Sequence, residues 1–153
     1  MQIRPYTEDD IPEISRLYYN TVHRVNSRDY SPEQIRAWVP ALPAGSWWKN
    51  RFRSRQVYVA VDAGKVIGFV EFTMAGHIDC FYVHHMYQRR GVGRALMAVV
   101  DEEFHNSNVH RVYAEVSITA VPFFQGMGFQ AREERNLDYN GVNLRLYLME
   151  KYY

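Results

Sequence analysis

The segment Tyr87–Met97, "YQRRGVGRALM", combines glycines, arginines and a glutamine in an arrangement that could bind an anionic ligand. Glycines stand at positions 91 and 93, and an apolar pattern of helical spacing begins at Val92. Glycine lets a backbone approach a ligand closely, and the free N–H groups of a helix N-terminus favour a phosphate. Side-chain donors and positive charge come from four neighbours, Gln88, Arg89, Arg90 and Arg94. The segment is predicted to cradle a pyrophosphate; the simpler alternative is a glycine-rich loop that only starts a helix.

Two nucleotide-binding motifs are incompatible with this segment. A Walker loop needs Lys-Ser or Lys-Thr after its last glycine, whereas Arg94-Ala95 follows here. A dinucleotide fingerprint needs a third glycine where Leu96 stands, and it belongs in a parallel βαβ unit. The ligand is therefore expected to be a pyrophosphate of another kind.

The elements around this loop predict a mixed fold. Helical spacing favours helices at about 8–24, from Pro32 to before Pro40, at 46–52, from Val92 onward and near 118–128. Alternation predicts strands at Gln2–Pro5, Gln56–Asp62, Val66–Ala75, His77–Val83, Arg111–Val116 and on both sides of Asn140-Gly141. Short connections make the middle strands antiparallel, so the order does not fit a doubly wound fold. We expect an α/β (α+β) domain with a largely antiparallel sheet over residues 1–153.

Composition narrows the class of protein. The chain has 153 residues, of which 47% are hydrophobic and 23% are charged, and its formal net charge is +1. This balance argues against a dedicated nucleic-acid binder, and the single cysteine, Cys80, excludes an internal disulfide and a cysteine-based zinc site. No apolar run approaches the ~20 residues of a membrane span. We expect a cytoplasmic protein without a membrane or nucleic-acid partner.

The motifs resemble those of the GNAT superfamily of N-acetyltransferases. "YQRRGVG" is similar to the family's Q/R-x-x-G-x-G/A signature, and "ITAVPFFQGMGF" resembles its later segment ending in Gly-Phe. "YSPEQIRAW" and "SITAVPFF" are similar to a group of small bacterial GNAT proteins. The resemblance covers essentially the whole chain. It implies a splayed, mostly antiparallel sheet of six or seven strands flanked by about four helices.

The resemblance also implies a binding mode for acetyl-CoA. The pyrophosphate would rest on the loop, which comprises Gln88, Arg89, Arg90, Gly91, Val92, Gly93, Arg94 and Ala95. The pantetheine arm would pair with the backbone of a strand at Phe81, Tyr82 and Val83, where the sheet splays. Ser117 would hydrogen-bond CoA, and Phe124 would lie beside it. The implied reaction is direct acetyl transfer to a primary amine, with no metal.

His77 and Asp79 are the predicted catalytic residues. In several GNAT enzymes the base lies eleven or nine residues before the glycine signature, and these positions are His77 and Asp79 here. Residues i and i+2 of a strand share a face, so both are expected on the side of Phe81. An imidazole titrates near neutrality, whereas Asp79 would act through water or orient His77 or a substrate cation. Glu71 and Glu115 are weaker candidates.

Two positions depart from the family pattern. The tyrosine that protonates the departing thiolate aligns with Phe124, which has no donor, so Tyr139, Tyr113 or water would have to act. His84-His85 replaces the more usual Asp-Pro. Adjacent strand-end histidines are expected to point to opposite sides, which makes them a poor chelate for a metal.

The acceptor is a small-molecule or peptide amine whose identity the sequence does not define. Tyr30, Trp38 and Glu71 are the residues expected to bind it, with Trp47 and Trp48 on the same side. A CoA-binding module with little or no catalysis is the alternative, and Phe124 is its best support. A third class, acting on aminoacyl-tRNA, would need a basic face that the net charge of +1 does not favour. A homodimer is left open.

Overall fold

A single seven-stranded sheet forms the centre of the molecule. The computed structural model describes all residues 1–153, and the strand order is β1-β2-β3-β4-β5-β7-β6. The strands are β1 Gln2–Pro5, β2 Gln56–Asp62, β3 Lys65–Phe72, β4 His77–Val83, β5 Arg111–Ser117, β6 Gln130–Tyr139 and β7 Val142–Tyr152. Every neighbouring pair is antiparallel except β4 and β5. The predicted mixed, largely antiparallel architecture is confirmed.

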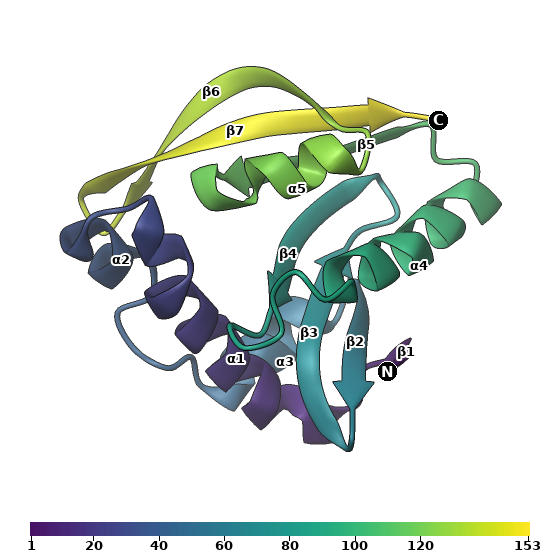
Figure 1. The fold of residues 1–153 in the computed structure, drawn as a ribbon, viewed down its shortest axis with the longest axis horizontal. Helices are drawn as coiled ribbons and strands as arrows, with labels where there is room; N and C mark the ends of the chain where they lie inside the picture. Colours follow the sequence, from purple (N-terminus) through teal and green to yellow (C-terminus); the bar gives the residue numbers. More distant parts are fainter.

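Strands β4 and β5 separate soon after they meet. They are parallel and pair only at His77 with Tyr113 and at Ile78 with Ala114. From Asp79 onward the two strands share no register, and Figure 1 shows them diverging beside α5. The expected splay is therefore present, and it opens the middle of the sheet to a ligand.

Helices cover both faces of the sheet (Figure 1). One face carries α1 Ile11–Arg24, α2 Pro32–Trp38 and α3 Gly45–Phe52, and the other carries α4 Val92–Asn106 and α5 Val121–Gly126. Three short 3-10 turns, η1 Glu8–Asp10, η2 Asn26–Arg28 and η3 Ile118–Ala120, adjoin these helices. None of the five α-helices combines the length and apolar character that a membrane crossing requires.

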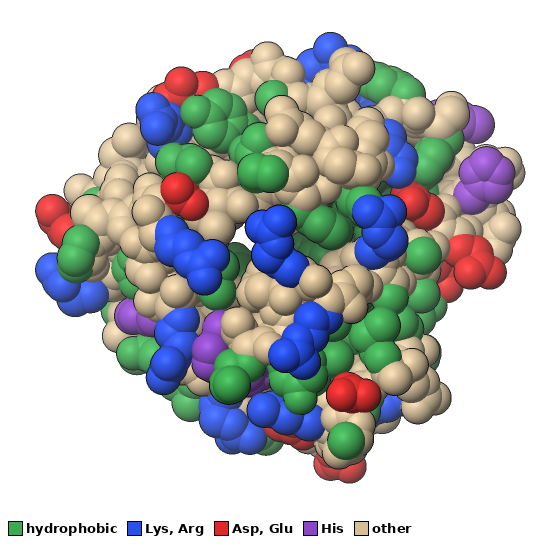
Figure 2. Space-filling view, in the orientation of Figure 1, with side chains coloured by type: hydrophobic (Ala, Val, Ile, Leu, Met, Phe, Trp, Pro, Cys, Tyr) green, Lys and Arg blue, Asp and Glu red, His purple; other side chains and the backbone are tan.

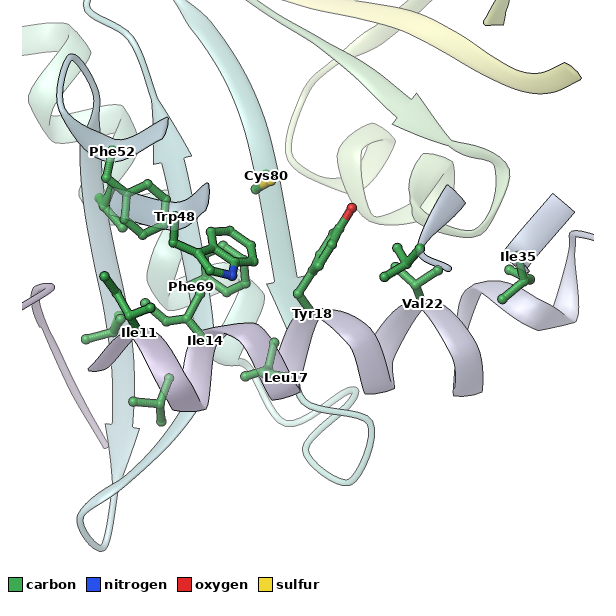
Figure 3. Close-up of a cluster of buried hydrophobic side chains, with 14 of the residues drawn as sticks. Ile11, Ile14, Leu17, Tyr18, Val22, Ile35, Trp48, Phe52, Phe69 and Cys80 are labelled. Atoms are coloured by element: carbon green, nitrogen blue, oxygen red, sulfur yellow. The ribbon is translucent and has the colours of Figure 1, made fainter. Parts of the chain in front are cut away.

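The core is divided between the two faces. Strand β3 is buried on both sides, so Phe69 packs in the cluster under α1 and α3 while Val70 packs in the cluster under α4. Figure 3 shows the first cluster, where Trp48 of α3 lies beside Phe69 and Tyr18 extends from α1 toward the side of Cys80. Burial of these large side chains holds α1 and α3 against β3 and β4. Residues of α1, α3 and β4 also line the candidate site described below.

Local signals in the sequence set several element ends. Ser31 caps α2 in a capping box with Gln34, as the sequence predicts. Asn140 and Gly141 adopt positive φ values of 53° and 82° and form the turn between β6 and β7. The strand expected at Val66–Ala75 was too long, because it ends at Phe72. The N–H of Gly76 donates to the carbonyl of Thr73 at 3.0 Å, and this turn replaces the last strand residues.

Candidate active site

A groove of about 710 Å³ runs along the loop that precedes α4. One wall comes from the end of α1 and from η2, and the other from the loop, the first turn of α4, and α5. Arg28, Arg89 and Arg94 contribute positive charge to its lining. Figure 2 shows Lys and Arg side chains around a hollow in the middle of this face. A basic groove beside a helix N-terminus suits an anionic ligand.

The two glycines of the loop are needed for different reasons. Gly91 is the N-cap of α4 and has φ +84°, a left-handed conformation that other residues rarely adopt. A Cβ at Gly91 would meet nothing within 4 Å. At Gly93, in contrast, a Cβ would lie 2.9 Å from Cε1 of Phe123. Gly91 therefore sets the turn of the loop, and Gly93 allows α4 to pack against α5.

Most of the predicted loop residues line the groove, and two do not. The lining includes Gln88, Arg89, Gly91, Val92, Gly93 and Arg94. Arg90 lies outside it, with its guanidinium 5.4 Å from the ring centroid of Tyr87. Ala95 also lies outside, and its N–H donates to the carbonyl of Gly91 at 3.0 Å within the helix. The geometry therefore does not support a direct ligand contact by either residue.

The loop is tied to the end of β4. The amide Nε2 of Gln88 donates to the carbonyl of Val83 at 2.7 Å, and the hydroxyl of Thr21 donates to the same carbonyl at 3.1 Å. Gln88 thus positions the loop instead of offering this donor to a ligand. Phe81, Tyr82 and Val83 all line the groove, as expected, but the carbonyl of Val83 already accepts two hydrogen bonds.

A second cavity, of about 380 Å³, opens on the other side of the splay. It lies between β4, β5 and the helices α1, α2 and α3, and the end of β6 completes its wall. Five residues line both the groove and this cavity: Phe81, Tyr82, Ser117, Ala120 and Phe124. The two spaces therefore meet at the splay, so a ligand in one can be reached by a ligand in the other.

Ser117 stands at this junction within a small polar network. Its hydroxyl accepts from Nδ2 of Asn26 at 3.1 Å and from the N–H of Ala120 at 3.3 Å. Asn26 is buried and also lines the groove. Phe124 is buried against Phe81, with ring centroids 5.8 Å apart, and supplies no hydroxyl. The departure from the family pattern at Phe124 thus leaves the junction without that donor.

Two arginines and two carboxylates form an ion-pair network beside the cavity. Glu71 is fully buried and pairs with Arg51 and, at 3.3 Å, with Arg55. Oδ2 of Asp79 lies 2.8 Å from Nη2 of Arg51 and 2.5 Å from Nη1 of Arg55. Ligand atoms of Glu71, Asp79 and Cys80 lie within 4.8 Å of one another, but the arginines already bind both carboxylates.

The ion-pair network sets the protonation state of the Asp79 carboxyl. Burial raises the pKa of the Asp79 carboxyl, but the hydrogen bond from Arg55 and the charge of Arg51 outweigh it and hold the pKa below its usual value. Asp79 therefore stays ionised and paired near neutral pH, which makes it a weak proton acceptor. A positioning role, one of the alternatives considered for Asp79, fits this geometry better than direct proton transfer.

His77, Glu115 and Tyr139 are the other ionisable groups of the cavity wall that matter here. The ring of His77 stacks on Tyr113, with centroids 4.8 Å apart. The side-chain carboxylate of Glu115 has no ion-pair or hydrogen-bond partner in the chain, although the backbone of Glu115 pairs with Leu148 in the sheet. Burial, followed by the charge of Asp79, raises the pKa of Tyr139, so its hydroxyl stays protonated. Glu115 was ranked low from the sequence, although alternation places it on the same face as Ser117.

Of the residues expected to bind an acceptor, only Trp38 lines the cavity. Tyr30 is buried, and its hydroxyl donates to the carbonyl of Arg145 and accepts from the N–H of Ile118, at 2.7 and 2.9 Å. Glu71 is buried behind the wall in its ion pairs. The placement of Tyr30 and Glu71 does not support direct acceptor contact. Trp47 lines the cavity, whereas Trp48 belongs to the core.

The expectation that the side chains of His84 and His85 point to opposite sides was wrong. Their rings stack, with centroids 4.4 Å apart and planes 18° from parallel. β4 ends at Val83, so strand alternation no longer separates the two side chains. Nδ1 of His84 accepts from the N–H of Met86 at 3.0 Å, which fixes the ring in a turn.

Comparison with known proteins shows which family the chain belongs to. The family described as acetyltransferase (GNAT) domain matches residues 26–151. The chain is 33% identical over 142 residues to the uncharacterized N-acetyltransferase YafP of Escherichia coli (strain K12), covering 93% of this chain and 89% of that relative.

Solved structures share the fold over almost the whole chain. A GCN5-related N-acetyltransferase from Rhodopseudomonas palustris has a TM-score of 0.94 at 26% identity, covering 99% of this chain and 95% of that one. The PaiA N-acetyltransferase from Thermoplasma acidophilum, solved in complex with coenzyme A, has a TM-score of 0.79 at 18% identity, with coverage of 99% and 98%. The chain belongs to the GNAT family and is an N-acetyltransferase.

Proposed function

We propose that residues 1–153 form one catalytic domain that transfers an acetyl group from acetyl-CoA to a primary amine. The observation that carries the proposal is the meeting of a basic groove and a separate cavity at the splay of β4 and β5. A long anionic donor and a compact acceptor need such an arrangement, because their reacting atoms must come together while their bodies stay apart. The PaiA enzyme, which shares this fold, was solved with coenzyme A.

Different residues of the groove would bind different parts of acetyl-CoA. The loop from Gln88 to Arg94 would bind the pyrophosphate through backbone N–H groups, helped by the left-handed turn at Gly91. Arg28 on the opposite wall, together with Arg89 and Arg94, supplies positive charge. The pantetheine arm would follow β4 past Val83 toward Phe81, and the thioester would reach the junction near Ser117.

In the reaction, the amine nitrogen bonds to the acetyl carbon, the C–S bond of the thioester breaks, and CoA leaves as the thiol. The amine must lose a proton, and we assign its acceptance to His77 through water, because a neutral imidazole nitrogen can accept a proton and His77 lines the cavity. Asp79 keeps its ion pairs with Arg51 and Arg55 and so holds these side chains in place beside the cavity. Tyr139 stays protonated and is the donor from the cavity wall for the departing sulfur, in place of the missing hydroxyl at Phe124.

Acetyl-CoA binding and steady release of CoA thiol test this function. Acetyl-CoA should raise the melting temperature, and an amine panel should include an acceptor that drives continuous thiol release. Binding without turnover by any amine would favour the alternative, a CoA-binding module with little catalysis. No thermal shift at saturating acetyl-CoA would contradict the proposal itself.

His77 is tested by substitution. His77→Ala should lower kcat at near-neutral pH about 100-fold or more, as expected for loss of a general base, and leave acetyl-CoA binding intact. His110→Ala is the matched control, since His110 is exposed and lines neither the groove nor the cavity. Equal kcat values for both variants would remove His77 from the mechanism.

A further inference from the structure

The wall of the acceptor cavity is mainly aromatic. Five aromatic side chains from five elements form its body: Tyr18, Trp38, Trp47, Tyr82 and Tyr139. Several of them contact one another, with ring centroids 5.0 Å apart for Tyr18 and Tyr82 and 6.5 Å apart for Trp38 and Tyr139. At about 380 Å³ the cavity lies near the small end of the range for small-molecule sites. Such a wall favours a compact ligand with a flat apolar body.

The cavity also carries one uncompensated negative charge. The charges of Arg51 and Arg55 are balanced by those of Glu71 and Asp79 through close ion pairs. Glu115 lines the same cavity from β5 and has no such partner. A half-buried carboxylate among aromatic side chains is poorly solvated, so a single ammonium group from a ligand would stabilise it.

Glu115 is also correctly placed relative to the reaction. It precedes Ser117 by two residues on the same face of β5, and Ser117 lies at the junction with the donor groove. Two residues of a strand span about 7 Å, which puts an ammonium group held by Glu115 close to the thioester.

Other amine classes fit this cavity less well. A polyamine would bring several positive charges to a wall with one free carboxylate. An amino acid would bring a carboxylate, but the nearest cation, Arg51, already pairs with Glu71 and Asp79. An acceptor with one charge and no carboxylate meets neither difficulty.

We propose that the acceptor is a small primary arylalkyl monoamine, whose aromatic body fills the cavity and whose ammonium group is bound by Glu115. This inference rests on the proposed function and adds the substrate class to it. The bound ammonium releases one proton through water to His77, and the free amine then attacks the acetyl carbon. As the C–S bond breaks, Tyr139 gives its proton to the sulfur and regains one through water from the nitrogen, so that CoA leaves as the thiol.

Ligand binding in the presence of CoA tests the inference without requiring turnover. Trp38 and Trp47 line the cavity, so quenching of tryptophan fluorescence reports occupancy. Phenethylamine should bind at least about 10-fold more tightly than 2-phenylethanol, which keeps the ring and lacks the charge. It should also bind more tightly than spermidine and L-phenylalanine. Tighter binding of any comparator, or no saturable binding of phenethylamine, would overturn the inference.

A matched pair of variants tests the role of Glu115. Glu115→Gln should weaken phenethylamine binding about 10- to 100-fold and leave 2-phenylethanol binding unchanged. Glu102→Gln, on the exposed side of α4, makes the same chemical change outside both cavities and should bind phenethylamine as the wild type does. Wild-type affinity in Glu115→Gln would contradict the inference. Acetylation of another amine but not of bound phenethylamine would overturn the substrate class and leave the proposed function intact, whereas acetylation of no amine at all would contradict the proposed function.

Discussion

Substitution of Gly91 by alanine separates the stability of the loop from its role in binding the donor. Gly91 has φ +84°, and no atom lies within 4 Å of the Cβ that alanine would add. Gly64, in the turn between β2 and β3, has φ +76° and equally open surroundings. The two sites therefore impose the same kind of backbone strain without a steric clash, but only Gly91 lines the donor groove.

The magnitude follows from the left-handed backbone. An L-residue in this conformation costs about 1–2 kcal/mol, so both Gly91→Ala and Gly64→Ala should destabilise the protein by that amount. For a domain of this size, the melting temperature should fall by roughly 2–8 °C. Any part of this strain that the free Gly91→Ala protein relieves by relaxing its loop does not lower stability, and it must be regained when acetyl-CoA restores the turn. Full relief would move the 1–2 kcal/mol from stability to binding and weaken binding by about 5- to 30-fold.

Thermal unfolding and calorimetric titration with acetyl-CoA measure the two effects separately. We expect a loss of melting temperature in Gly64→Ala, an equal or smaller loss in Gly91→Ala, and weaker acetyl-CoA binding in Gly91→Ala alone. If Gly91→Ala and Gly64→Ala bind acetyl-CoA equally well, the turn at Gly91 does not form the pyrophosphate site and the reasoning is refuted.

Three further predictions concern packing and charge. Gly93→Ala should weaken acetyl-CoA binding, because its Cβ would lie 2.9 Å from Phe123. Phe123→Leu in the same chain should restore part of the affinity, and titrations that show no rescue would argue against this contact. Glu71→Gln should lower the free energy of unfolding in urea by about 2 kcal/mol, since it leaves two partly buried arginines with one carboxylate. The control Glu133→Gln removes an exposed carboxylate and should change this free energy by less than about 0.5 kcal/mol. Equal effects of the two substitutions would refute a structural role for the network. The lowered pKa of Asp79 adds stability that is present above about pH 4 and is lost as the pH falls through its folded-state pKa. Asp79→Asn should therefore be less stable than the wild type at neutral pH and should lose less stability on acidification. Parallel curves of stability against pH would contradict this.

Much of the architecture was accessible from the sequence because its signals are local. The capping box at Ser31 and the Asn140-Gly141 turn act over a few residues, and both lie where predicted. The strand ending at Phe72 was overestimated because an apolar alanine and methionine continue the pattern, while the turn at Gly76 depends on its hydrogen bond to Thr73. The stacked rings of His84 and His85 depend similarly on where β4 ends.

The charged part of the site could not be predicted, because it forms between elements distant in the chain. Asp79 could be named as a candidate from its spacing, but its partner Arg51 comes from α3, whose docking depends on the packing of Trp48. The sequence therefore does not show that Asp79 is held in ion pairs while the carboxylate of Glu115 has no partner. The glycine loop could be predicted, since its conformation and its position before α4 are set within a few residues.

Product analysis is the most direct test of the central claim, that this protein transfers acetyl groups from acetyl-CoA to an amine. The protein would be incubated with labelled acetyl-CoA and a panel of primary amines including phenethylamine, and both products would be quantified by mass spectrometry. We expect one N-acetylated amine for each CoA released, with the labelled acetyl group bonded to the amine nitrogen. Release of CoA with free acetate and no acetylated amine, or no release although acetyl-CoA binds, would contradict it.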